Sequence, residues 1–166
     1  EKPMSLFEDD QYRWRETYFV LFPAKNRPSL DKVRQALSMA AEQLELAGGD
    51  ADDNGRFESI TVVAPDDFAA IDVSFLSGDE VREQANQLAD DMTELGCEAD
   101  VKARIRELRR YDGRFDVLHF EQVGAMEEES DDADGMLNPS TLLLVLDCLA
   151  RLTDGAAIDP QTGTFV

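Results

Sequence analysis

The spacing of hydrophobic positions along this chain predicts alternating strands and helices. Residues 12–22 are rich in aromatic and β-branched side chains and stop at Pro23, which is typical of a central strand. Ser29 is a suitable N-cap for a helix that we expect to end at Gly48-Gly49. Its apolar stripe follows the three- and four-residue spacing of a helix face and comprises Leu30, Val33, Leu37, Ala40, Ala41 and Leu44. Residues 1–11 lack a period and are expected to form a flexible arm.

The middle of the chain predicts a β-hairpin followed by two helices. Residues 56–64 and 68–76 read as strands around the turn sequence Pro65-Asp66-Asp67, and in the second strand apolar and polar positions alternate, so one face is expected to be wetter. A helix from Ser77 or Asp79 to Gly96 follows. Residues 100–111 fit a short helix or a strand of a hairpin that turns at Asp112-Gly113. We favour the helix because Lys, Arg, Glu and Leu dominate this segment.

The last part of the chain predicts a strand at residues 115–123, an acidic loop at 124–135 and a closing helix. Asn138 is a good N-cap for that helix, and Pro139 suits its first position. Residues 142–152 are apolar nearly all round, so the helix is expected to lie against a sheet in the core. We expect Gly155 to take a left-handed C-cap conformation and to lead into a short strand or hairpin around residues 160–163.

These elements together predict an α+β fold. Helices interleaved with a β-hairpin favour a mostly antiparallel sheet with helices packed on one face, a two-layer sandwich that follows the ferredoxin-like plait or a variant of it. No repeat, linker or second core is evident, so residues 12–166 are expected to form a single domain. The layout resembles that of many small bacterial α+β domains, and no motif ties the chain to a named family.

Charge is the strongest bulk signal. Among 166 residues, 16 are Lys or Arg and 36 are Asp or Glu, which gives a net charge of −20 at pH 7. Such a surface repels nucleic acids and anionic membranes, and no apolar run approaches the ~20 residues that span a bilayer. Two cysteines predict no disulfide framework and favour a reducing, cytoplasmic location. The charge is interpreted first as a means of solubility, and second as a mimic of nucleic acid that binds a basic partner.

The strongest lead to a metal site is the segment at residues 50–58. It alternates oxygen-bearing side chains, has Gly55 at the sixth position and places Phe57 after it, as calcium loops do. The candidate Ca²⁺ ligands are Asp50, Asp52, Asn54 and Glu58. The twelfth position is Thr61, which cannot supply the bidentate carboxylate of such loops, and a strand rather than a helix is expected to follow. A structural Asp-Asn-Gly turn is therefore the favoured interpretation, and no other cofactor is expected.

Three further groups of residues were considered as sites. His119 and Glu121 share a strand face and are candidates for a general base and its partner, although a structural histidine is favoured because no nucleophile motif accompanies them. The one basic cluster, at residues 102–114, is expected to pair with acidic neighbours or with an acidic face of a second copy. Candidate pocket residues near the closing turn, for which capping and turn roles are favoured, are Asp147, Asp154, Asp159 and Gln161.

We therefore expect a non-enzymatic protein-interaction module that binds a protein partner or itself, and neither nucleic acid nor a membrane. This expectation rests on the lack of a catalytic motif and on the alternation at residues 71–75, which suggests a partly open sheet face for docking. The alternatives are a divalent-metal-dependent enzyme or calcium-binding domain that uses residues 50–58, a hydrolase that uses His119 with Glu121, and the nucleic-acid mimic.

Overall fold

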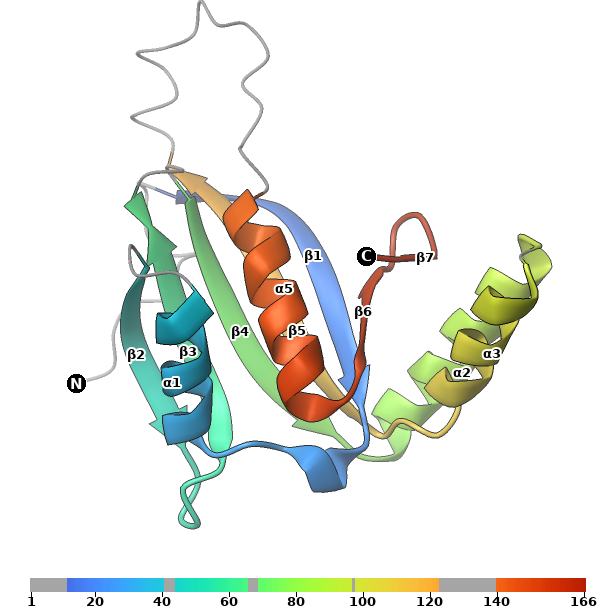
Figure 1. The fold of residues 1–166 in the computed structure, drawn as a ribbon, viewed down its shortest axis with the longest axis horizontal. Coiled ribbons are helices and arrows are strands. Elements are labelled where there is room, and N and C mark those ends of the chain that lie inside the picture. Colours follow the sequence, from blue (N-terminus) through green and yellow to red (C-terminus); the bar gives the residue numbers. More distant parts are fainter. Residues whose placement is uncertain (1–11, 41–43, 66–68, 97, 123–139) are drawn as a thin grey trace, which may run out of the picture.

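The computed structural model describes residues 12–40, 44–65, 69–96, 98–122 and 140–166. Seven strands form one sheet in the order β2-β3-β4-β5-β1-β6-β7, with antiparallel neighbours throughout (Figure 1). The strands are β1 (Tyr12–Phe22), β2 (Glu45–Ala51), β3 (Phe57–Ala64), β4 (Ala69–Ser77), β5 (Gly113–Gln122), β6 (Ala156–Asp159) and β7 (Thr164–Phe165). The helices are α1 (Leu30–Ala40), α2 (Asp79–Glu94), α3 (Ala99–Leu108) and α5 (Ser140–Thr153), with a short 3-10 helix, η2 (Ala24–Asn26). The predicted α+β class with an antiparallel sheet is confirmed.

Strand β1 lies inside the sheet, between β5 and β6. It pairs with β5 along its whole length, from Tyr12 opposite Gln122 to Phe22 opposite Gly113, with a bulge between Trp14 and Glu16. Within the described residues, β6 pairs with β1 only along Phe19–Leu21. The last three residues of β1, Val20–Phe22, are buried, as expected for the apolar end of a strand rich in aromatic and β-branched side chains.

Helices lie on both faces of the sheet. Because side chains alternate along a strand, Val20 and Phe22 of β1 point to the face covered by α1 and α5, while Leu21 points to the other face. There Leu21 packs with β6 against α2 and α3, and α2 also reaches β5, where Gln84 contacts Arg114. The expectation of helices on one face therefore holds for α1 and α5 but not for α2 and α3. The strand order does not confirm the ferredoxin-like plait.

The prediction of a helix up to Gly48-Gly49 was wrong in its C-terminal part. Helix α1 ends at Ala40, residues 41–43 lie outside the described chain, and residues 45–51 form the edge strand β2, which pairs with β3. Leu44 and Leu46 pack against the core from this edge. Gly48 adopts a left-handed φ of 58° where the β2–β3 register shifts, so a glycine marks an irregularity within a strand here and not a helix end.

The turn after α5 also differs from its prediction. Asp154, not Gly155, is left-handed, with φ of 55°. Gly155 is needed because the chain passes very close to β1: a Cβ atom at this position would lie 2.3 Å from the carbonyl oxygen of Leu21. The glycine thus permits close approach of two backbones. It still contributes to the helix C-cap, because its N–H donates to the carbonyl oxygen of Ala150 at 2.9 Å while Asp154 holds the left-handed position.

The remaining predicted elements within the described residues are present. Strands β3 and β4 pair as the predicted hairpin, and α2 follows it. Helix α3 confirms the helical interpretation of residues 100–111, and β5, α5 and the β6–β7 hairpin follow. The predicted arm at residues 1–11, the loop at 124–135, and Asn138 and Pro139 lie outside the described residues.

Candidate functional site

Helix α5 carries more apolar surface than the sheet covers. Leu142, Leu146 and Leu149 are buried against the sheet, as the apolar composition predicted. Leu143 and Leu144, however, remain 46% and 42% exposed on the outer side of the helix. Large exposed apolar side chains that cluster on one element are characteristic of binding surfaces.

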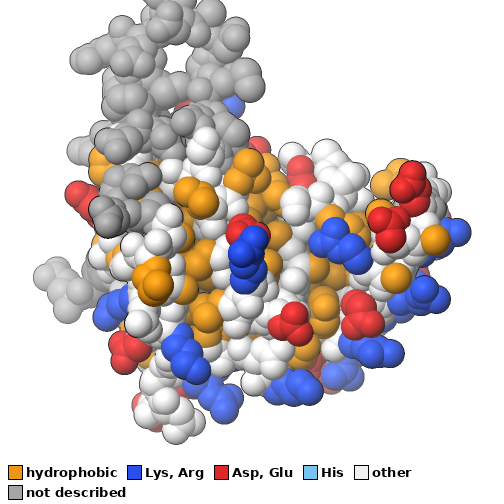
Figure 2. Space-filling model, in the orientation of Figure 1, with side chains coloured by type: hydrophobic (Ala, Val, Ile, Leu, Met, Phe, Trp, Pro, Cys, Tyr) orange, Lys and Arg blue, Asp and Glu red, His pale blue; other side chains and the backbone are white. Residues whose placement is uncertain are grey.

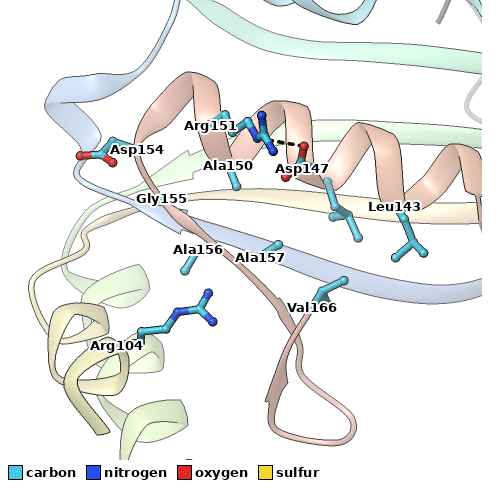
Figure 3. Close-up of a pocket in the computed structure, with 11 residues that line it drawn as sticks. Arg104, Leu143, Asp147, Ala150, Arg151, Asp154, Gly155, Ala156, Ala157 and Val166 are labelled. Atoms are coloured by element: carbon cyan, nitrogen blue, oxygen red, sulfur yellow. Dashed lines mark ion pairs between the residues drawn. The ribbon is translucent and has the colours of Figure 1, made fainter. Parts of the chain in front are cut away.

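A groove with a volume of about 450 Å³ lies beside this exposed side, between α5, β6 and α3 (Figure 3). Alanine and glycine residues line the groove where α5 passes into β6, so an occupant can approach the backbone closely there. Figure 2 shows that hydrophobic side chains gather over α5 and the groove on this face of the molecule. The residues that line the groove include Leu143 and Ala150 of α5, Gly155, Ala156 and Ala157 at the start of β6, Arg104 of α3, and Val166.

The charged groups at the groove are balanced. On α5, Arg151 Nε lies 3.0 Å from Asp147 Oδ2, an exposed pair one helical turn apart that contributes only about 0.3–0.5 kcal/mol to stability. The Arg104 guanidinium lies 3.9 Å from the centroid of the Phe165 ring, in a cation–π contact with β7. A groove of this kind suits an occupant with apolar side chains and few charges.

Two of the four residues predicted to share a pocket reach this groove. Asp147 and Asp154 line it, although capping and turn roles were the favoured interpretation from the sequence. Asp159 Oδ1 instead accepts a hydrogen bond of 2.9 Å from the backbone N–H of Gln161, in the turn between β6 and β7. The favoured turn role therefore describes Asp159 and Gln161.

His119 and Glu121 lie on one face of β5, as predicted, and both are nearly fully buried. His119 Nδ1 is 3.3 Å from Glu16 Oε1, while Glu121 Oε1 accepts a hydrogen bond of 2.6 Å from Arg13 Nε. A general base must reach the proton that it removes, and His119 is only 2% exposed. This burial favours a structural role, in which Glu16 of β1 pairs with His119 and Arg13 of β1 pairs with Glu121.

Tyr18 lies beside this cluster and provides a pH-dependent test of it. Burial, and then the negative charges of Glu16 and Asp159, raise the pKa of the Tyr18 hydroxyl to about 12. In the unfolded chain a tyrosine ionises near pH 10, so Tyr18 contributes fully to stability below about pH 10. That contribution is lost as the pH rises through its folded pKa, because the unfolded state releases the proton first.

We expect an alkaline absorbance titration of the folded protein to show one tyrosine that ionises near pH 12. Replacing Tyr18 with Phe should remove that step and reduce the loss of stability between about pH 10 and 12. Wild-type and Tyr18→Phe proteins with the same titration curve would contradict the assignment.

The four predicted calcium ligands lie on the hairpin that joins β2 and β3. Asp52 Oδ1 accepts hydrogen bonds of 2.9 Å from the backbone N–H groups of Asn54 and Arg56, and the Arg56 bond is the main reason that the pKa of Asp52 is lowered. Asp50 Oδ2 accepts a bond of 3.2 Å from Ser59 Oγ, while Asn54 and Glu58 are exposed. These contacts describe an Asx turn.

In the part of the chain that the structure describes, no three His, Cys, Asp or Glu side chains come together as a metal-ligand set. Calcium binding by Asp50, Asp52, Asn54 and Glu58 remains a prediction from the sequence.

The basic cluster is divided among several partners. Arg109 Nη2 lies 2.5 Å from Asp90 Oδ1 on α2, and Arg110 Nη1 lies 3.8 Å from Glu107 Oε1. Arg114 is buried on the face of β5 next to α2, where its Nε donates to Asp116 Oδ1 at 2.7 Å and its guanidinium stacks over Phe19. The expected pairing with acidic neighbours within the chain is thus observed for these three arginines.

Comparisons of this chain with known protein families, with characterised proteins and with solved structures found no match. Among the described helices, none combines the length and the apolar character needed to cross a bilayer. The outer side of α5 is the part of the site that the sequence analysis missed. Its signal was present in Leu143 and Leu144, because a helix that is apolar all round carries more apolar residues than one sheet face can bury.

Proposed function

We propose that this chain is a non-enzymatic protein-interaction domain whose binding site is the α5 surface, by which we mean the exposed side of α5 together with the groove beside it. The α5 surface is defined by Leu143, Leu144, Asp147, Arg151 and Val166. The observation that carries the proposal is that this apolar, charge-balanced surface lies on a chain with a net charge of −20. Apolar side chains beside a balanced pair of opposite charges are compatible with a protein interface, which has an apolar core and a polar rim.

The two exposed leucines of this surface would supply part of the energy of binding. Full burial of a leucine side chain is worth about 1.5–3 kcal/mol, and Leu143 and Leu144 each have nearly half of their surface left to bury. Binding energy in interfaces is concentrated in a few well-packed residues of this type. The two leucines therefore mark where binding energy would be concentrated, and the groove and the charged pair beside them would supply the remaining contacts.

The sheet face suggested by the sequence is a weaker candidate. Ile71 and Val73 are buried under α1 and α5, and on the opposite face of β4 and β3 the Asp72 carboxylate accepts a hydrogen bond of 3.2 Å from Thr61 Oγ1. The apolar cluster on that opposite face, formed by Ala70 and Phe120 with Tyr12 and Leu118, is buried at Ala70 and Phe120. A cytoplasmic location fits the free, half-buried thiol of Cys148.

Selection of displayed peptides against the full chain tests this proposal. Peptides that bind the wild type are expected to bind the Leu144→Asp variant at least tenfold more weakly, which corresponds to about 1.4 kcal/mol. The matched control is Leu76→Asp, because Leu76 is 40% exposed on β4, away from α5. Peptides that lose affinity equally for both variants, or for Leu76→Asp alone, would place the binding site elsewhere.

A further inference from the structure

The charges on the exposed side of α5 match themselves when a second copy of the helix is laid alongside in the opposite direction. Asp147 and Arg151 are the two charged residues of α5, and both are exposed. In an antiparallel pair of α5 helices, Arg151 of one copy lies opposite Asp147 of the other, and twofold symmetry creates the same contact a second time. Each carboxylate then meets a guanidinium from the partner helix.

We propose that the α5 surface binds a second copy of this chain, in a twofold dimer whose α5 helices pack antiparallel. This inference rests on the proposed function, because it names the partner of the same surface. It adds the orientation of the two helices and the pairs of residues that meet across the twofold axis.

The shape of the surface is consistent with this arrangement. Leu143 lies near the N-terminal end of α5, at one end of the groove, whereas small residues line the groove at the other end (Figure 3). Leu144 is the next residue along the helix and is also exposed. Antiparallel packing lays the leucine end of one helix over the C-terminal end of the other. The leucines of each copy thus enter the partner's groove, next to Ala150, Gly155 and Ala157.

Charge also distinguishes α5 from acidic elements such as α2 as a site for self-association. Two copies that each carry a charge of −20 repel one another, and the repulsion is strongest where acidic faces meet. Helix α2, for example, carries six acidic residues and one arginine. Helix α5 has no net charge, so two α5 surfaces come together without local repulsion.

The dimer is expected to strengthen as salt rises from low to physiological concentration. Screening reduces the long-range repulsion between two chains of charge −20, because the Debye length falls from about 30 Å at 0.01 M to about 8 Å at 0.15 M. The ion pairs between Asp147 of one copy and Arg151 of the other are partly buried in the proposed interface, so salt screens them less than it screens the long-range repulsion.

Sedimentation equilibrium of the full chain in about 0.15 M salt tests the proposal. We expect a mass twice that of the 18.5 kDa chain, and at least a tenfold weaker dimer for Asp147→Arg and for Arg151→Asp. Asp147→Arg leaves arginine at both positions, and Arg151→Asp leaves aspartate at both. An equimolar mixture of these two variants should therefore recover the dimer, because the two arginines of one chain face the two aspartates of the other. The double variant D147R/R151D should also recover it, and Leu76→Asp should behave as wild type.

A wild-type chain that stays monomeric at about 0.1 mM, well above the micromolar affinities of ordinary interfaces, would overturn the dimer. A dimer that neither single charge reversal weakens would overturn the antiparallel arrangement. If the chain is monomeric but selected peptides still depend on Leu144, the dimer fails and the proposed function stands. If peptide binding is also independent of Leu144, both fail.

Discussion

Replacing Gly155 with alanine is expected to destabilise the protein by about 3 kcal/mol. The added Cβ atom would lie 2.3 Å from the carbonyl oxygen of Leu21 and 2.8 Å from the Cβ atom of Phe22. Both contacts involve β1, a strand held by β5 on one side and β6 on the other. Relief of the clash therefore requires the α5–β6 connection to move away from the sheet, which disturbs the pairing of β6 and the floor of the groove.

Urea denaturation of wild-type and Gly155→Ala proteins measures this effect. The control is Gly49→Ala on the edge strand β2, where the added Cβ would lie 2.7 Å from Arg34 Nη2, the far end of a flexible side chain. We expect the control to change the free energy of unfolding by less than about 1 kcal/mol. Equal midpoints for wild type and Gly155→Ala would mean that the close approach of the two backbones is not required.

Replacing Phe115 with alanine is expected to destabilise the protein by about 3–5 kcal/mol. Phe115 is fully buried on β5, and its ring centroid lies 4.7 Å from that of Phe22 and 5.3 Å from that of Phe57. The substitution removes this ring from the contact between the sheet and the helices α1 and α5. It leaves a cavity and also loses the aromatic contacts, each worth about 0.5–1.5 kcal/mol beyond burial.

The same denaturation experiment tests this prediction, with Phe165→Ala as the control. Phe165 lies on the two-residue strand β7, is half-buried and contacts the Arg104 guanidinium, so its loss is expected to cost about 1 kcal/mol. The loss of stability in Phe115→Leu should lie between the losses in Phe165→Ala and Phe115→Ala, because leucine fills part of the cavity. If the Phe165 variant proved as unstable as the Phe115 variant, the aromatic cluster would not be the main source of stability.

The sequence predicted elements that have a strong local period and failed where tertiary contacts decide. Helix α2 and the β3–β4 hairpin were predicted because their apolar spacing and turn residues are local signals. Strand β2 was missed because Leu44 continues the helical spacing of α1, while the pairing of β2 with β3 depends on residues up to eighteen positions later, from Glu45 opposite Val63. The position of β1 between β5 and β6 has no local signal at all.

The candidate site was predicted only in part, for the same reason. Asp147 and Asp154 belong to one helix and its C-terminal turn, so their proximity follows from local sequence. Arg104 reaches the groove from α3, which lies about fifty positions earlier in the chain, and only the fold brings it there. The need for Gly155 is likewise set by Leu21, a residue of the first strand.

The position of β1 also determines the order in which the sheet can form during translation. Arg13 and Glu121, which pair across β1 and β5, are 108 positions apart. At about 5–20 residues per second, the ribosome releases β1 on the order of ten seconds before β5. The β2–β3–β4 meander has its partners close in sequence and can pair during that interval. Strand β1 is therefore expected to wait for β5 before it joins the sheet, and β6 and β7 are added after it. Repulsion between acidic nascent chains keeps the apolar end of β1 from aggregating until then.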